Sequence, residues 1–211
     1  PFVPAVEFDE AIDDILGRYP TLAPGYLAVQ QAYAKGHAFA LAKSTDEVLT
    51  RKVQDVIGKA IAQGQGRAKT VTMIANLGGW TKAYSTLVFK TNASTAYANG
   101  IRSQMEDPDI EEVMPALQFI GRAQPPSRPN HIACVGLIAG TRNKLWDKYE
   151  PPLGYSCSHS INGIDRWELK ERGLLNKDGS VREYFPPGFA GGGPDPGFEK
   201  GTVATRRLGR V

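Results

Sequence analysis

The sequence predicts an α+β protein, with a helical N-terminal half followed by a small, loop-rich C-terminal module with short strands. Three observations lead to this prediction. Residues 1–105 place apolar side chains at helical spacing. Residues 116–201 contain short apolar runs separated by turn residues. Between them lies an acidic run, residues 106–115, that we interpret as a solvated linker, and residues 202–211 form a basic tail.

Three helices are expected near the N-terminus. Residues 8–16 carry apolar side chains on one face and acidic side chains on the other. Residues 24–42 are rich in alanine, which favours a second helix. A third helix covers residues 48–61 with one apolar stripe, and Ser44 and Glu47 in front of it have the spacing of a capping box.

Two further helices complete the predicted helical half. A short helix covers residues 71–77 and is closed by Gly78 and Gly79. A long helix covers residues 81–105. One face of the long helix is formed by Tyr84, Leu87, Val88, Thr91 and Thr95.

Short strands and loops are expected after the acidic run. Three short apolar runs, at residues 116–121, 131–140 and 153–157, are typical of strands bounded by tight turns. From about residue 173 the chain is dense in proline and glycine, which cannot hold long regular elements. The last third is therefore predicted to consist mainly of loops.

The composition shows no strong bias towards one class of partner. The chain has 211 residues, 41% of them hydrophobic, which suits one domain or two small ones with a real core. A net charge of +3 does not by itself predict nucleic-acid binding. No apolar run approaches the roughly 20 residues of a membrane span, and the first residues do not resemble a signal peptide. The two cysteines are therefore expected as reduced thiols in a cytoplasmic setting.

Both cysteines and two of the three histidines fall within one stretch of 29 residues. They are His131, Cys134, Cys157 and His159. Thiolate and imidazole are ligands that zinc prefers, usually four in a tetrahedron. A bound metal would also stabilise a module that has few long elements. One hypothesis is therefore a structural zinc held by these four residues.

Three alternatives remain open for the same residues. Cys134 lies in an apolar run and can be a packed thiol, with His131 hydrogen-bonded nearby. The two cysteines can also form a disulfide. Finally, Cys157 can be a nucleophile with His131 or His159 as its base. Because no orienting group and no substrate pocket are recognisable, no catalytic residue is predicted.

Phosphate-binding motifs are absent, and the basic residues are scattered. The sequence contains no G-x-x-x-x-G-K-[ST] loop and no G-x-G-x-x-G after a predicted strand. Only Arg206, Arg207 and Arg210 cluster, in a tail that is a candidate for contact with DNA phosphates or an acidic partner. His37, in the alanine-rich helix, is interpreted as a structural or surface histidine rather than a ligand.

Four segments, taken in order, resemble a known family. They are LVFKTNASTAYANGIRSQM, SRPNHIACVG, LWDKYEPPLGYSCSH and PDPGF. Their order and spacing are similar to those of the phage Mu protein F-like minor head proteins, also called head morphogenesis proteins. The family pattern runs from R-T-N-x-x-T-A-Y-x-x-G through R-P-x-H and F-W to P-P-x-G-[WFY]-x-C-x-C. The resemblance covers the chain from about residue 46 to residue 201.

The matching positions fall into two sets. The helical signature is matched by Lys90, Thr91, Asn92, Thr95, Ala96, Tyr97 and Gly100. The later motifs are matched by Arg128, Pro129, His131, Trp146, Pro151, Pro152, Gly154 and Cys157.

Three departures from the family pattern matter. His159 stands where the family has a second cysteine, which keeps a ligand that zinc accepts. Lys90 replaces an arginine and keeps the charge but not the planar fork. Gln124-Pro125-Pro126 replaces a more polar stretch, which weakens a catalytic interpretation.

The resemblance implies a minor capsid protein of a tailed, Mu-like bacteriophage and not an enzyme. Such a protein associates with the portal protein and with the major capsid or scaffolding protein, and acts in head assembly, DNA packaging or ejection. It is expected in the virion, in the head interior or portal region, and in the host cytoplasm during assembly, with no membrane partner. Packaged DNA is a further candidate partner. The candidates for contact with the portal protein or DNA are Lys90, Arg102, Arg206, Arg207 and Arg210.

Two other functions are alternatives. One is a zinc- or cysteine-dependent hydrolase or nuclease carried in the virion. The other is a non-specific DNA-binding protein, against which stand the modest net charge of +3 and the acidic run.

Overall fold

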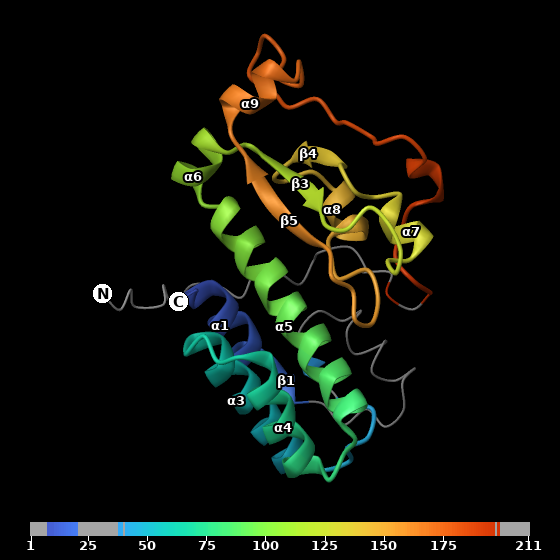
Figure 1. Cartoon of the computed structure of the whole chain (residues 1–211). Coiled ribbons are helices and arrows are strands. Elements are labelled where there is room, and N and C mark those ends of the chain that lie inside the picture. The colour runs from blue at the N-terminus through green and yellow to red at the C-terminus, as the bar shows by residue number, and fades with distance from the viewer. Residues whose placement is uncertain (1–7, 21–37, 40, 197, 199–211) are drawn as a thin grey trace, which may run out of the picture. The chain divides into compact units, whose positions relative to one another are not determined.

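The structure is a computed structural model that describes residues 8–20, 38–39, 41–196 and 198. It confirms the α+β class, because helices dominate the N-terminal half and a three-stranded antiparallel sheet lies in the C-terminal half (Figure 1). The chain divides into two compact units between Gly100 and Ile101, inside one long helix. We call the described residues up to Gly100 the helical unit and those from Ile101 onwards the sheet unit.

The described part of the helical unit contains helices and one short pair of parallel strands (Figure 1). The helices are α1 (Asp9–Gly17), α3 (Glu47–Ala62), α4 (Arg67–Gly78) and α5 (Lys82–Met105), which continues into the sheet unit. The strands are β1 (Tyr19–Pro20) and β2 (Ala38–Phe39). Four of the predicted helices are therefore present.

The second predicted helix, residues 24–42, has a different outcome. Most of it lies outside the described residues, as does His37. Its residues 38–39 form strand β2, which pairs with β1, so the helix does not extend to residue 42. Alanine content favoured a helix there, but pairing with another part of the chain decides the local structure.

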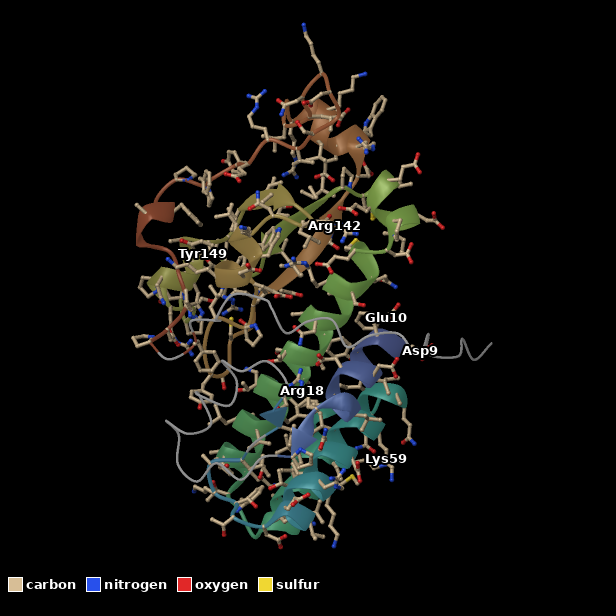
Figure 2. All side chains as sticks on the ribbon, turned by 180° about the vertical axis from the view of Figure 1, so that it is seen from behind. Asp9, Glu10, Arg18, Lys59, Arg142 and Tyr149 are labelled. Atoms are coloured by element: carbon tan, nitrogen blue, oxygen red, sulfur yellow. The ribbon has the colours of Figure 1, made fainter. Side chains whose placement is uncertain are left out.

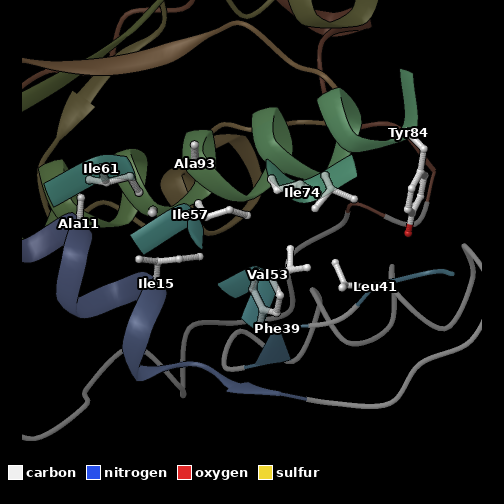
Figure 3. Packing of buried hydrophobic residues seen from close by; sticks show 12 residues of the cluster. Ala11, Ile15, Phe39, Leu41, Val53, Ile57, Ile61, Ile74, Tyr84 and Ala93 are labelled. Atoms are coloured by element: carbon white, nitrogen blue, oxygen red, sulfur yellow. The ribbon is translucent and has the colours of Figure 1, made fainter. Parts of the chain in front are cut away.

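An apolar core holds the helical unit together. Figure 3 shows side chains of α1, β2, α3, α4 and α5 that point towards one another. The fully buried members include Ala11, Ile15, Phe39, Val53, Ile57 and Ile74. Burying one large aliphatic or aromatic side chain stabilises a fold by about 1.5–3 kcal/mol, so this cluster is the main source of stability here.

Gly100 allows α1 to approach α5 closely. A Cβ atom at position 100 would lie 2.8 Å from the backbone nitrogen of Ala11 and 2.9 Å from the ring of Phe8. Beside it, the Asn99 side chain donates a hydrogen bond of 2.8 Å to Asp14 on α1. The glycine of the helical signature therefore has a packing role in this fold.

The polar residues of the helical signature face inwards. Thr91, Asn92 and Thr95 are all buried. Asn92 donates to the carbonyl of Val88 at 2.9 Å, and Thr95 donates to the carbonyl of Thr91 at 2.8 Å. Asn92 and Thr95 thus each place a polar group in a hydrogen bond within their own helix, which lets them occupy a packed face.

The N-terminus of α3 is capped differently from the prediction. Asp46 is the N-cap, and its carboxylate accepts from the amides of Val48 at 2.8 Å and Leu49 at 3.2 Å. The Ser44 hydroxyl instead accepts from the Asp46 amide and from the Thr50 hydroxyl. Asp46 reaches the free amides of the first turn directly, so the predicted box of Ser44 and Glu47 does not form.

Charges at the two ends of α1 suit the helix dipole. Figure 2 shows Asp9 and Glu10 in the first turn and Arg18 beyond the last turn. Acidic groups near the N-terminus and basic groups near the C-terminus of a helix are each stabilising. Arg18 is also buried and paired with Asp14 one turn earlier.

The sheet unit is built on three antiparallel strands in the order β4-β3-β5 (Figure 1). The strands are β3 (Ala116–Ile120), β4 (Ile138–Gly140) and β5 (Ser160–Ile164). Ala116 pairs with Gly140 on one side and with Ile164 on the other. The short helices are α6 (Pro108–Val113), α7 (Pro129–Ile132), α8 (Leu145–Tyr149), α9 (Arg166–Glu171) and the 3-10 turn η1 (Phe189–Gly191).

Three expectations for the sheet unit differ from the structure. The acidic run contains a helix, α6, because Asp107 caps its first turn and Pro108 suits the first helical position. Of the run 131–140, only residues 138–140 form a strand, while its start belongs to α7. The run 153–157 forms no strand, and β5 follows it instead.

A second core lies within the sheet unit. Its fully buried members include Leu117, Phe119, Cys134, Leu137, Ala139 and Trp146. The Trp146 ring nitrogen donates to the carbonyl of Gly140 at 3.0 Å, so the largest side chain of this core is also satisfied. Arg142, labelled in Figure 2, ties α6 to the turn after β4 by a 2.8 Å contact with Glu111. In the part of the chain that the structure describes, no helix is long and apolar enough to cross a bilayer.

Candidate metal centre

Three of the four predicted zinc ligands come together in the sheet unit. A ligand atom of each of His131, Cys157 and His159 lies within 4.8 Å of the other two. The three side chains are buried, with exposed fractions of 1%, 4% and 5%. One thiol and two imidazoles at this separation form a group that could bind a metal ion.

The short helix α7 positions His131. Pro129 starts the helix, and the first hydrogen bonds of the turn run from the amides of His131 and Ile132 to the carbonyl of Arg128. The His131 Nε2 atom lies 3.1 Å from Asp195 Oδ1 and 3.3 Å from the Arg128 guanidinium. Both polar neighbours of this nitrogen are therefore charged groups.

A tight turn positions Cys157 and His159. The Cys157 amide donates to the carbonyl of Gly154 at 3.2 Å, and Ser156 has the left-handed φ of 54°. The Cys157 sulfur and His159 Nδ1 are 3.4 Å apart. On the other side of the ring, His159 Nε2 lies 3.2 Å from the carbonyl oxygen of Arg122.

The contact with Arg122 determines the form of the His159 ring. A carbonyl oxygen accepts hydrogen bonds and cannot donate one, so Nε2 carries a proton. In the neutral ring, Nδ1 then has its lone pair free, directed at the Cys157 sulfur. Metal-binding histidines commonly donate their other ring N–H to a carbonyl or carboxylate, and His159 has this arrangement.

Burial keeps the three groups neutral. Desolvation lowers the pKa values of His131 and His159 below 6.5, although Asp195 partly opposes the shift at His131. Desolvation also raises the pKa of Cys157 above 9.0. At neutral pH the cluster therefore holds two neutral imidazoles, which are ready to bind a metal, and a thiol, which must lose its proton to do so.

Cys134 does not join the cluster. It is fully buried in the second core, and its thiol lies 3.5 Å from the carbonyl of Asn130. Burial raises its pKa to about 11, as expected for an inert packed thiol. Both cysteines are free thiols, so the alternative disulfide is not formed. For Cys134 the structure supports the packed-thiol interpretation.

Asp195, which the sequence did not single out, is the acidic partner of the site. Its Oδ2 accepts from the Arg128 guanidinium at 2.6 Å, and its Oδ1 accepts from the Asn130 side chain at 3.2 Å. Arg128 also donates to the carbonyl of Tyr155. The only sequence signal was that Asp195 belongs to the PDPGF segment of the resemblance.

The predicted basic contact residues have mixed outcomes. Lys90 is half-buried on α5. Arg102 is only 5% exposed and forms a 2.6 Å ion pair with Glu106, so we withdraw it as a surface contact. Arg206, Arg207 and Arg210 lie outside the described residues.

Comparisons with known proteins give no relative. Scans of protein-family models, curated proteins and solved structures each found no match.

Proposed function

We propose that this chain is a minor head protein of a tailed bacteriophage whose sheet unit is stabilised by one structural zinc. The observation that carries the proposal is the convergence of its motifs. Arg128 and His131 come from one motif of the resemblance, Gly154 and Cys157 from a second, and Asp195 from a third. In the fold these residues contact one another around one buried cluster.

Burial favours a structural role for the metal. The three ligands are at least 95% buried, because their exposed fractions do not exceed 5%. The nearest carboxylate, Asp195, already accepts from Arg128 and Asn130. A carboxylate engaged in this way is not free to activate a water molecule. The raised pKa of Cys157 likewise opposes a role as an activated nucleophile.

A zinc would stabilise the sheet unit, which has few long regular elements. Its sheet has three short strands, and long loops connect its elements. Binding to ligands that are far apart in the sequence contributes directly to folding, because the unfolded chain offers no preformed site. The role in the head, with the portal protein and the major capsid or scaffolding protein as partners, rests on the resemblance.

One observation favours a metal-dependent hydrolase as a second candidate. Among the described residues the cluster supplies three ligands, and zinc with three protein ligands ordinarily carries water at a fourth position. The two candidates differ in a measurable way. A structural zinc supports stability without turnover, whereas a hydrolase should cleave DNA or a model ester when loaded with zinc.

Elemental analysis of the purified chain tests the metal. We expect about one zinc per chain in the wild type, because the three ligands surround one position. His159→Ala should lose this zinc together with part of the thermal stability of the protein. Lys144→Ala is the control, because Lys144 is exposed and does not belong to the cluster. Full zinc content in His159→Ala would contradict the assignment.

The role in the head is tested with phage particles. Virions of the phage whose genome carries this sequence should contain the chain in a few copies by quantitative mass spectrometry. Disrupting the gene should give particles that are defective in assembly, packaging or ejection. Normal infectious particles without the chain would contradict the proposed role, whatever the zinc content.

A further inference from the structure

A short segment near the end of the sheet unit contacts His131 and other residues beside the candidate metal cluster. We call residues 193–196 together with Phe198 the strap. At one end, Gly193 and Asn130 exchange two hydrogen bonds of 3.0 and 3.1 Å. At the other end, Phe198 is buried and meets the ring of Tyr155 edge to face, with centroids 4.8 Å apart. The strap therefore bridges α7 and the turn that carries Cys157.

Asp195 joins the strap to the candidate ligand His131. Its amide donates to the carbonyl of Leu153 at 2.7 Å, which fixes the backbone of the strap. One carboxylate oxygen lies 3.1 Å from His131 Nε2, and the other accepts from Arg128 at 2.6 Å. Leu153 holds the strap backbone and Arg128 holds the carboxylate. Docking of the strap therefore places Asp195 beside the His131 ring.

Gly154 leaves the space that this docking needs. A Cβ atom at position 154 would lie 2.0 Å from the Asp195 carboxylate and 2.5 Å from the Arg128 guanidinium. Both contacts are far shorter than any van der Waals contact. Any larger residue at position 154 must therefore displace the Asp195 carboxylate or the Arg128 side chain.

We propose that Asp195 is a positioning residue for the metal site, and that metal binding and docking of the strap stabilise each other. This inference rests on the proposed zinc. An ionised carboxylate only accepts hydrogen bonds, so Nε2–H of His131 donates to Asp195, and the lone pair of the neutral ring is on Nδ1. Asp195 also fixes the plane of the ring. An ion that binds the oriented His131 ring more tightly than a freely rotating ring also shifts the equilibrium of the strap towards the docked state. The factor is the same in both directions.

Zinc titration of Asp195→Asn tests the positioning role. Loss of a carboxylate behind a metal-binding histidine typically weakens metal affinity by about 10–100-fold, and we expect a loss in this range. The number of zinc ions bound at saturation should not change. The absorption spectrum of the cobalt-loaded protein should also keep its shape, because the ligands themselves are unchanged. Asp178→Asn is the control, since Asp178 is an exposed carboxylate in a surface turn.

Hydrogen exchange tests the coupling. Adding zinc to the wild type should slow exchange of the strap amides of Gly193 and Asp195 by a factor similar to the loss of affinity in Asp195→Asn. The amide of Asn176, which is bonded to Ser180 in a separate turn, should not respond. Gly154→Ala offers a second route, because it pushes away the Asp195 carboxylate or the Arg128 guanidinium that holds it, without altering any candidate ligand. It should also weaken zinc binding.

The outcomes separate the two proposals. If the wild type binds no zinc, the proposed zinc and this inference both fail. If it binds zinc but Asp195→Asn and Gly154→Ala bind equally tightly and the strap amides do not respond, the inference alone fails. If Asp195→Asn changes the cobalt spectrum, Asp195 is a direct ligand and not a positioning residue, which also overturns the inference.

Discussion

Gly121 lies so close to His159 that a Cβ atom at position 121 would be 2.5 Å from the imidazole Cδ2. The φ angle of Gly121 is 146°, which side chains other than glycine rarely adopt. The backbone of the loop after β3 therefore lies directly against the ring of a candidate ligand.

Gly121→Ala is expected to destabilise the sheet unit. Backbone strain and the clash with His159 should each contribute, with a combined loss of about 1–3 kcal/mol in the free energy of unfolding. Zinc affinity should fall as well, because the ring is displaced. Gly191→Ala is the control, since a Cβ atom there meets nothing within 4 Å and the φ angle is not positive. Denaturant unfolding that leaves the two variants equally stable would contradict this prediction.

The two cysteines are expected to respond differently to substitution. Cys157→Ala should lose zinc, because it removes the only thiol of the cluster. Cys134→Ala should keep zinc and lose only packing, at a cost on the order of 1 kcal/mol for a small buried side chain. Zinc content and thermal unfolding of both variants check this. Loss of zinc in Cys134→Ala would restore the four-ligand site that the sequence suggested.

The metal-free protein should be most stable between about pH 6.5 and pH 9. The pKa values of His131 and His159 are lowered from 6.5 by burial, so the unfolded chain binds more protons than the folded one as the pH falls below 6.5, and stability is lost. The pKa of Cys157 is raised from 9.0, so the folded chain retains the proton longer, and stability falls as the pH rises above 9.0.

Chemical denaturation across this pH range, after treatment with a chelator, measures the profile. His159→Ala should show a weaker loss on the acid side, because one of the two buried imidazoles is gone. Lys59→Ala, on an exposed helix position, should not change the profile. An acid limb of unchanged steepness in His159→Ala would show that this ring does not contribute.

Asp46→Ala should destabilise the helical unit by about 0.5–2 kcal/mol, the usual cost of losing a side-chain N-cap. Its carboxylate holds the amides of both Val48 and Leu49. Asp55→Ala, at an exposed position within α3, is the matched control. Thermal unfolding of the two variants compares them directly. Equal stability would mean that the cap is replaced by water without cost.

The sequence predicted α1, α3, α4 and α5 because their apolar side chains recur at helical spacing. The stripe from Val48 to Ile61 runs through four helical turns, so one misplaced residue does not hide it. Strand β5 was missed because its five residues include Gly163 and little alternation of apolar side chains. The glycine is required by packing, since a Cβ atom there would lie 2.7 Å from the sulfur of Met105.

The candidate site was predicted in part for a similar reason. His131, Cys157 and His159 are recognisable by their chemistry alone, whatever the fold. Cys134 has the same chemistry, but its position in a helical turn directs its thiol at the carbonyl of Asn130, four residues earlier. Asp195 is one acidic residue among many, and only the fold brings it to His131.

The distance along the chain between Asp195 and His131 has a consequence for the order of folding. Their contact closes a loop of 64 residues, whereas helices α3 and α4, which pack together, follow each other directly. Local contacts form first, and distant ones must await closure of the intervening chain. During synthesis the helical unit can therefore fold while the sheet unit is incomplete. A nascent chain that has not yet reached residue 195 already holds every candidate ligand, but it lacks the carboxylate that orients the first of them.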